Sequence, residues 1–512
     1  MVTHQPTPPS NHGTSTANAQ APRSNLERAR RFGRLFPDEE CWTLGDPVRD
    51  LDACDKIAAA MHAAGSQASQ KLPAGFTYLG QFIDHDITFD PTSIGERAVD
   101  LDELVNFRTP ALDLDSIYGS GPAGQPYLYV TEPRTGIAGP FDTGRFMAVG
   151  PVTFVPTAPG NEEESVRQRD GDLYDLPRSA AGLANKRALI ADPRNDENLL
   201  VAQLHRSFLH FHNAVAFERP DLKNLKAVRL EVMRHYQWML LHEFLPAIAG
   251  QAAVDAARKE RRFYKVGPGA ADPAPYIPLE FSGAAYRFGH SMVRDTYHFN
   301  TVFKPGTPTN LIFTFTGRGG FRSGDRYPTN WLVDWAQFFD GLRAGTSAQR
   351  AMRIDPALSG MLSKIPVGPT ETRPLAALNL ERAFKHYRLP SGQKVALRMG
   401  IKPLTPAQLK EGIAGVEMDA LGLTQSTPLW LYLLKEAELQ HAGEQLGDVG
   451  GTIVAEVFVG LLAADPESIL SHPEWRPEGG NFGMADLFRR IERNAGQAQA
   501  LIPTAGVINP LG

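Results

Sequence analysis

The chain has 512 residues, of which 42% are hydrophobic and 21% are charged, and its formal net charge is -5. This composition is typical of a globular protein that can bury a large core. The slightly acidic balance gives no basis for a polyanionic partner, so we do not expect nucleic-acid binding. The only cysteines are Cys41 and Cys54, which could pair or stay free, so no disulfide framework holds the fold.

Residues 1–25 are rich in Pro, Ser, Thr, Gln and Asn and lack the apolar segment of a signal peptide. We expect a disordered tail there, followed by one catalytic domain over 26–512. The longest apolar run, 453–464, is interrupted by Glu456 and is too short to span a membrane. We therefore expect a soluble protein, either cytoplasmic or exported by a leaderless route, and leave its oligomeric state open.

Hydrophobic periodicity predicts helices joined by long loops. In chain order, helices are expected over 199–217, 221–250, 430–441 and 449–463. Stretches rich in Pro, Gly and Asp predict loops over 151–178 and 266–278, and alternating strand patterns are scarce. The expected fold class is therefore mainly α, as a single large helical domain with long loops and little sheet.

The first candidate site is the segment Gln81-Phe82-Ile83-Asp84-His85-Asp86. If it is helical, successive side chains leave the axis about 100° apart, so Asp84, His85 and Asp86 face three different surroundings. Gln81 lies four residues before His85 and shares its face. Buried charges need partners or metals, so this cluster is costly as core filling and indicates a functional site.

The next candidate is the loop Thr109-Pro110-Ala111-Leu112-Asp113-Leu114-Asp115. Side-chain oxygens of Thr109, Asp113 and Asp115, together with the carbonyl of Ala111, resemble the all-oxygen cage that Ca²⁺ prefers. The spacing is not that of an EF-hand. Alone, the motif is weak because aspartates are common in loops.

The segment 192–197 predicts the start of a helix, because Asp192 suits the N-cap and Pro193 suits the first helical position. Arg194 and Glu197 would then share a face one turn apart. In isolation, a capped helix with a solvated Arg/Glu pair is the simpler interpretation.

Two further candidates follow. His290 lies among aromatic and apolar residues, which is usual for a core histidine, and Gly289 before it would allow a flat group to approach closely. Asn379 lies in an apolar segment and needs a specific partner, for which an imidazole N–H would serve. The remaining histidines of 199–217, which are His205, His210 and His212, are expected to be packing or surface residues.

Together, the order and identity of these motifs resemble the animal-type haem peroxidases, the family of myeloperoxidase and lactoperoxidase, and most closely their bacterial members. The matching segments are 80–86, 109–119, 192–197, 286–290 and 375–386. The segment 428–438 resembles a further family motif. Five ordered matches are far more specific than any single motif.

The resemblance implies a bound haem b and assigns roles around it. His85 corresponds to the distal histidine, with Gln81 beside it, and Arg194 corresponds to the distal arginine. His290 corresponds to the proximal ligand of the haem iron. Asn379 corresponds to the partner of its other ring nitrogen, expected to act as an acceptor.

The resemblance also implies contacts at the haem edge and a calcium site. Asp84 and Glu197 stand where the family forms ester bonds to haem methyl groups, and Arg287 and Arg382 are candidates to pair with the haem propionates. Five residues match the calcium loop: Asp86, Thr109, Ala111, Asp113 and Asp115. Asn198 stands where myeloperoxidase has a haem-linked methionine, so that third bond cannot form and strong chloride oxidation is in doubt.

The function implied is reduction of hydrogen peroxide with oxidation of small donors, such as halides, pseudohalides or phenols, through a ferryl haem, in a response to oxidative stress. Fatty-acid dioxygenases of the cyclooxygenase and linoleate dioxygenase type share the superfamily. They carry a tyrosine three residues before the proximal histidine, where this chain has Arg287, with Tyr286 one residue earlier, so we favour the peroxidase. A non-enzymatic calcium-binding protein would have lost His85, Arg194 or His290.

Overall fold

The computed structural model describes residues 32–90, 104–130, 144–151, 174–179, 187–271, 273–313, 316, 329–367 and 370–496. The expected tail over 1–25 and most of the expected loop over 151–178 lie outside these residues. The expected loop over 266–278 is confirmed, apart from a two-residue strand at its end.

Helices dominate the described chain, which confirms the mainly α fold class. The longer α-helices are α2 (Pro47–Ala63), α3 (Gly75–Ile87), α6 (Leu199–Glu218), α7 (Leu225–Met239), α9 (Gln251–Lys259), α15 (Leu429–His441), α16 (Asp448–Ala464) and α17 (Met484–Arg493). The shorter ones are α4 (Asp115–Tyr118), α5 (Gly121–Gly124), α8 (Leu245–Ala249), α10 (Leu279–Ser282), α11 (Leu375–Glu381), α12 (Gly392–Arg398), α13 (Pro406–Leu409) and α14 (Gly415–Ala420).

Tighter and wider helical turns connect these helices. The 3₁₀ turns are η2 (Pro126–Leu128), η3 (Pro193–Asp196), η5 (Ala285–His290), η6 (Thr309–Phe313), η7 (Thr329–Trp331), η8 (Trp335–Gln337), η9 (Gly360–Ser363) and η11 (Glu478–Gly480). Two turns are π-helical, η4 (Leu240–Phe244) and η10 (Arg382–His386). Such π turns are often found at functional sites.

Strands are short and pair only in twos within the described residues. β1 (Phe32–Gly33) runs parallel to β5 (Ile277–Pro278). The other pairs are antiparallel: β2 (Ala68–Pro73) with β8 (Arg350–Met352), β3 (Gly150–Pro151) with β4 (Tyr174–Asp175), β6 (Thr296–Tyr297) with β7 (Thr307–Pro308), and β9 (Ile365–Pro366) with β10 (Thr372–Arg373). The sheets therefore join loops and form no layer of their own.

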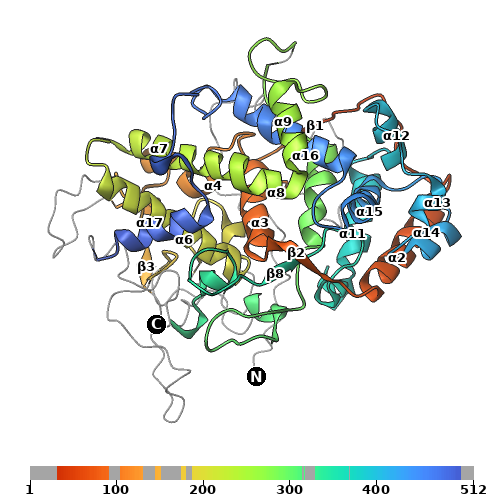
Figure 1. Ribbon diagram of the computed structural model, residues 1–512, viewed down its shortest axis with the longest axis horizontal. Coiled ribbons are helices and arrows are strands. Elements are labelled where there is room, and N and C mark those ends of the chain that lie inside the picture. The colour runs from red at the N-terminus through yellow and green to blue at the C-terminus, as the bar shows by residue number, and fades with distance from the viewer. Residues whose placement is uncertain are drawn as a thin grey trace, which may run out of the picture.

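Helix α3 lies in the middle of the molecule, with α6, α7 and α17 on one side of it and α2 and α11–α15 on the other (Figure 1). Its Phe82 stacks on Phe208 of α6 with ring centroids 4.7 Å apart, and Tyr236 of α7 meets the same ring edge-on at 6.5 Å. All three side chains are almost fully buried. This aromatic packing fixes the helix that carries the first candidate site.

Two predicted helices differ from the structure. The helix expected from Pro193 is only the 3₁₀ turn η3, and α6 starts at Leu199 because the Asn198 side chain accepts a hydrogen bond from the N–H of Val201. The helix expected over 221–250 starts at Leu225 and changes pitch at η4. It runs past Pro246, because that proline stands in the first turn of α8, where its missing N–H is tolerated. None of the helices in the described residues is long and apolar enough to cross a membrane.

Candidate functional site

The last turn of α3 presents three neighbouring polar side chains to three surroundings, as the sequence predicts for a helix. Asp84 Oδ1 accepts a hydrogen bond from the Thr88 hydroxyl at 2.9 Å. His85 turns toward residues 192–197, and Asp86 turns toward the loop that leads into α4. One helix thus connects three separate clusters.

His85 is held through an amide. Its Nδ1–H donates to Asn195 Oδ1 at 2.8 Å, so its Nε2 carries no proton. Asn195 Nδ2 in turn donates to His205 Nδ1 at 2.9 Å. Burial, reinforced by the Arg194 charge, lowers the pKa of His85 to about 4. The ring is therefore a neutral, oriented base at neutral pH.

Sequence reasoning missed Asn195 and placed His205 among packing or surface residues. His205 is buried, so packing is correct, but it also extends the hydrogen-bonded chain behind His85. The available signal was Asn195 itself, an amide directly after the candidate arginine and four residues before the apolar start of α6. Nothing in the sequence pairs it with a ring 110 residues away.

Arg194 lies beside this base but pairs with a different acid from the one expected. Its Nη2 donates to the backbone carbonyl of His85 at 3.0 Å and forms an ion pair with Asp192 at 2.7 Å. The guanidinium lies 4.4 Å from the centre of the Phe89 ring. The expected Arg194–Glu197 pair is wrong, because the tight η3 turn directs Arg194 back to its own N-cap.

Glu197 and Gln81 contact each other instead. Gln81 Nε2 donates to Glu197 Oε1 at 2.5 Å, and Gln81 Oε1 accepts from Asn198 Nδ2 at 3.1 Å. The structure therefore brings Gln81, from one motif, against Glu197, from another. Both side chains keep some accessible surface in the middle of the fold.

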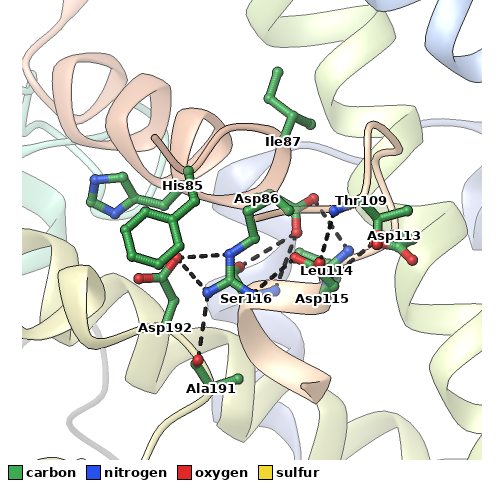
Figure 2. A network of polar contacts seen from close by, with 12 residues as sticks. His85, Asp86, Ile87, Thr109, Asp113, Leu114, Asp115, Ser116, Ala191 and Asp192 are labelled. Carbon is green, nitrogen blue, oxygen red and sulfur yellow. Dashed lines mark hydrogen bonds and ion pairs between the residues drawn. The ribbon is translucent and has the colours of Figure 1, made fainter. Parts of the chain in front are cut away.

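Asp192 connects the distal side to the predicted calcium loop (Figure 2). It is fully buried and accepts from Arg108 at 2.6 Å as well as from Arg194. Burial alone would raise the pKa of Asp192, but the two guanidinium groups hold it well below its usual range. Arg108 also lies 3.5 Å from Asp115, so a continuous chain of charges joins the loop to Arg194.

The loop gathers three carboxylates in one place, as Figure 2 shows. One oxygen from each of Asp86, Asp113 and Asp115 lies within 4.8 Å of the others. Burial and mutual repulsion raise the pKa of Asp86 and raise that of Asp113 to about 7. One buried and two partly buried acids with oxygen atoms this close form a donor set that suits a hard divalent cation.

The backbone of the same loop is shaped around these acids. Leu114 adopts φ 58°, a left-handed conformation that costs a branched residue about 1 kcal/mol or more, and its N–H donates to Asp86 at 3.2 Å. The N–H of Thr109 donates to Asp115 at 3.1 Å. Ala111 belongs to the same turn, with its N–H on the Thr109 carbonyl at 2.8 Å.

A separate cluster forms where η5 ends at His290, because Asn379 of α11 lies against that ring. Asn379 Nδ2 donates to His290 Nδ1 at 2.7 Å, while Asn379 Oδ1 accepts from Arg287 Nη1 at 3.2 Å. The pairing of Asn379 with His290 is as expected, but the amide is turned the other way, because Arg287 takes its oxygen. Burial, reinforced by the charges of Arg287 and Arg382, lowers the pKa of His290 to about 3.

The surroundings of Gly289 and Asp84 suit a flat anionic group. A methyl group added to Gly289 would meet no atom of the described residues within 4 Å, and His290 and Arg287 keep accessible surface. Burial raises the pKa of Asp84, and Arg194 from the distal cluster and Arg287 from the proximal cluster both oppose that shift. A base with a cation beside it, a second neutral imidazole and open space beside a glycine fit a haem.

The sequence left open the role of Tyr286 and whether Cys41 and Cys54 pair. Tyr286 stacks on Phe281 with ring centroids 4.8 Å apart, and its hydroxyl donates to the Gly80 carbonyl at 3.3 Å. Cys41 and Cys54 are both free.

The two other histidines of α6 are also buried. His212 lies between the Tyr118 hydroxyl and the Arg145 carbonyl, each 2.9 Å away. Like His205, His210 and His212 are packing residues rather than surface ones.

A comparison with known proteins identifies the family of this chain. The model of the animal haem peroxidase family matches residues 95–386, more than half of the chain. A peroxidase-like protein of Margaritifera margaritifera is 27% identical over 221 residues, which are 38% of this chain and 26% of that protein. Dual oxidase of Drosophila melanogaster is 28% identical over 213 residues, 38% of this chain and 12% of the oxidase. The chain thus matches about a quarter of the first relative and a smaller part of the second.

Solved structures show the same fold at low sequence identity. Peroxidase A from Dictyostelium discoideum superposes with a TM-score of 0.60 and 16% identity, covering 90% of this chain and 92% of that one. A fatty acid alpha-dioxygenase from Arabidopsis thaliana superposes with a TM-score of 0.56 and 14% identity, covering 91% and 78%. The fold is therefore shared by proteins of both kinds.

Proposed function

Because the chain belongs to the animal haem peroxidase family, we propose that it is a peroxidase that reduces hydrogen peroxide and oxidises small donors such as halides, pseudohalides or phenols. The observation that carries this proposal is the 2.8 Å hydrogen bond from His85 Nδ1 to Asn195. It leaves Nε2 of a neutral imidazole free to take a proton, which is what cleavage of a peroxide requires.

His85 and Arg194 have different roles in the proposed reaction. His85 Nε2 removes the proton from one peroxide oxygen and returns it to the oxygen that leaves. The guanidinium of Arg194, fixed by Asp192 and the His85 carbonyl, stabilises the negative charge on the leaving oxygen. Bound haem supplies the iron and the oxidising power.

The proximal residues hold the cofactor in this proposal. His290 is the iron ligand, and this requires its proton to be on Nδ1 and its Nε2 to be free. The Asn379 amide must then present its oxygen to the ring, which releases Arg287 to pair with a propionate alongside Arg382. Asp84 and Glu197 are the candidates for ester bonds to the haem edge.

We further propose that Asp86, Asp113 and Asp115 bind Ca²⁺, with Thr109 and the Ala111 carbonyl completing the site. The support is the cluster of three buried or partly buried carboxylates, whose raised pKa values show the cost of leaving them without a cation. Calorimetric titration should give one tight Ca²⁺ site per chain that is lost in Asp113→Asn. Absence of binding by the unmodified chain would contradict the assignment.

One test separates the peroxidase from the fatty-acid dioxygenase suggested by some structural neighbours. Purified protein should show a haem absorption band that changes within seconds of adding hydrogen peroxide, and guaiacol or iodide should restore it. Oxygen uptake with linoleate or palmitate, in the absence of peroxide, would favour the dioxygenase instead. The buried hydroxyl of Tyr286, bound to Gly80, supports the first outcome.

The ester bonds need their own test. Acid–acetone should fail to extract the haem after the protein has been exposed to peroxide, whereas Asp84→Asn combined with Glu197→Gln should release it fully. Full extraction from the unmodified chain would show that the haem is held without covalent bonds.

A further inference from the structure

A pocket of about 410 Å³ lies between the end of α7, the π turn η4, the end of α9 and the end of α16. Its polar lining consists of Arg258, Arg261, Arg476, His242 and Trp238, and the rest of the wall is apolar and mainly aliphatic. This volume lies in the range of pockets that bind small organic molecules. None of its lining residues takes part in the site described above.

The positive charges of this pocket have no acidic partners. Its lining contains no Asp or Glu, and within the described part of the chain neither Arg258 nor Arg261 forms an ion pair. Arg261 Nε is buried without a hydrogen-bond partner. Arg476 donates only to the carbonyls of Pro473 and Trp475. Three guanidinium groups therefore line one cavity, and none of them forms an ion pair with any described residue.

The Trp238 ring in the pocket wall is covered by the side chains of His242 and Arg476. The His242 ring lies 4.2 Å from the Trp238 ring at an interplanar angle of 31°, and the Arg476 guanidinium lies 5.4 Å from the centre of the same Trp238 ring. The π turn η4 places His242 there. Because Trp238 is covered in this way, the apolar wall left for a ligand is aliphatic, including Val459 and Ile469.

We propose that this pocket binds an amphiphilic carboxylate, with the head group on Arg258 and Arg261 and an aliphatic chain along α16. Guanidinium groups match a carboxylate through two parallel hydrogen bonds. A neutral ligand would leave the three cations unpaired, and a small hydrophilic anion would leave the aliphatic wall uncovered. Binding here is independent of the haem site and of the peroxidase reaction.

The test is calorimetric titration of the full-length haem-loaded protein with dodecanoate. We expect saturable binding at one site per chain, no binding of dodecyltrimethylammonium and only weak binding of dodecanol. Arg258→Gln should weaken dodecanoate binding by about tenfold or more, since it removes one of two charge-assisted contacts. Arg258 is exposed at the end of α9, so this change should not disturb folding. Arg398→Gln, on the exposed surface of α12, is the matched control and should leave binding unchanged.

Two further variants locate the binding. Ala463→Phe should abolish it by filling the cavity while keeping every charge. Arg194→Ala, in the haem site, should leave it intact. Unchanged binding in both Arg258→Gln and Ala463→Phe, or no binding by the unmodified chain, would overturn the proposal. Binding of dodecyl phosphate more than tenfold tighter than dodecanoate would overturn the choice of a carboxylate.

Discussion

The His85 and His290 clusters each pair an imidazole with an asparagine, but the two amides face opposite ways. Asn195 turns its oxygen to His85 Nδ1, and Asn379 turns its nitrogen to His290 Nδ1. The first arrangement leaves Nε2 free, whereas the second leaves the proton on it. The same two residue types therefore leave Nε2 without a proton on His85 and with a proton on His290.

The second hydrogen-bond partner of each asparagine explains this difference. Asn195 gives its amide nitrogen to His205, a ring that accepts, so its oxygen is available to His85. Asn379 gives its oxygen to Arg287, which can only donate. On the distal side a second histidine fixes the amide, and on the proximal side a cation does. A bound anionic cofactor would compete for Arg287 but not for His205.

The largest expected effect concerns the proximal side. His290→Ala should prevent stable haem binding, because the remaining proximal side chains offer no axial nitrogen. The haem content per chain, measured from its absorption after purification with added haem, reports this directly. Tyr286→Phe is the control and should keep its haem. Stoichiometric haem in His290→Ala would refute the proximal assignment.

The next effect belongs to the distal cation. Arg194→Ala should retain haem but react with hydrogen peroxide roughly 10² to 10³ times more slowly, because it removes a fixed charge at the leaving oxygen. Stopped-flow absorption measures the rate constant. Arg194→Lys, which keeps the charge without the fork, should recover part of the rate. A wild-type rate in Arg194→Ala would exclude the proposed role.

A smaller effect should distinguish the contribution of the Asn195 amide to the peroxide reaction from that of His205. Asn195→Val leaves His85 Nδ1–H without a partner and should slow the peroxide reaction by roughly ten- to a hundredfold. His205→Leu keeps the Asn195 oxygen on His85 and should slow it much less. The same stopped-flow assay compares the two. Equal losses would mean that packing, and not the bond to His85, governs the rate.

A third buried imidazole, away from both asparagines, tests whether burial alone keeps these rings neutral. Burial lowers the pKa of His212 to about 4, from 6.5 for an exposed ring. The unfolded chain therefore binds the extra proton first, so the stability linked to this ring is complete above pH 6.5 and is lost as the pH falls toward 4. Between pH 7 and pH 4, the free energy of unfolding should fall by about 3 kcal/mol more in the unmodified chain than in His212→Gln. Urea unfolding at the two pH values measures the difference, and parallel losses would contradict it.

Much of this architecture was accessible from the residues alone. The divergence of Asp84, His85 and Asp86 follows from helical geometry, and the fold class follows from periodicity and from the resemblance of the ordered motifs. The pairing of Arg194 with Asp192 was missed, because it depends on a 3₁₀ turn that a capping pattern cannot distinguish from an α-helix. The Asn195 contacts and the orientation of Asn379 depend on rings and cations brought together from distant segments, for which local sequence carries no signal.

Asp192 is shared by Arg108 and Arg194, and Arg108 also reaches Asp115 in the acidic loop. If a divalent ion draws Asp115 to itself, Arg108 has only Asp192 left to neutralise it, and Arg194 loses part of its own counter-charge. The Arg194 guanidinium would then attract negative charge more strongly. In the proposed reaction, a chain that lacks the ion would therefore be slower to cleave peroxide than one that carries it.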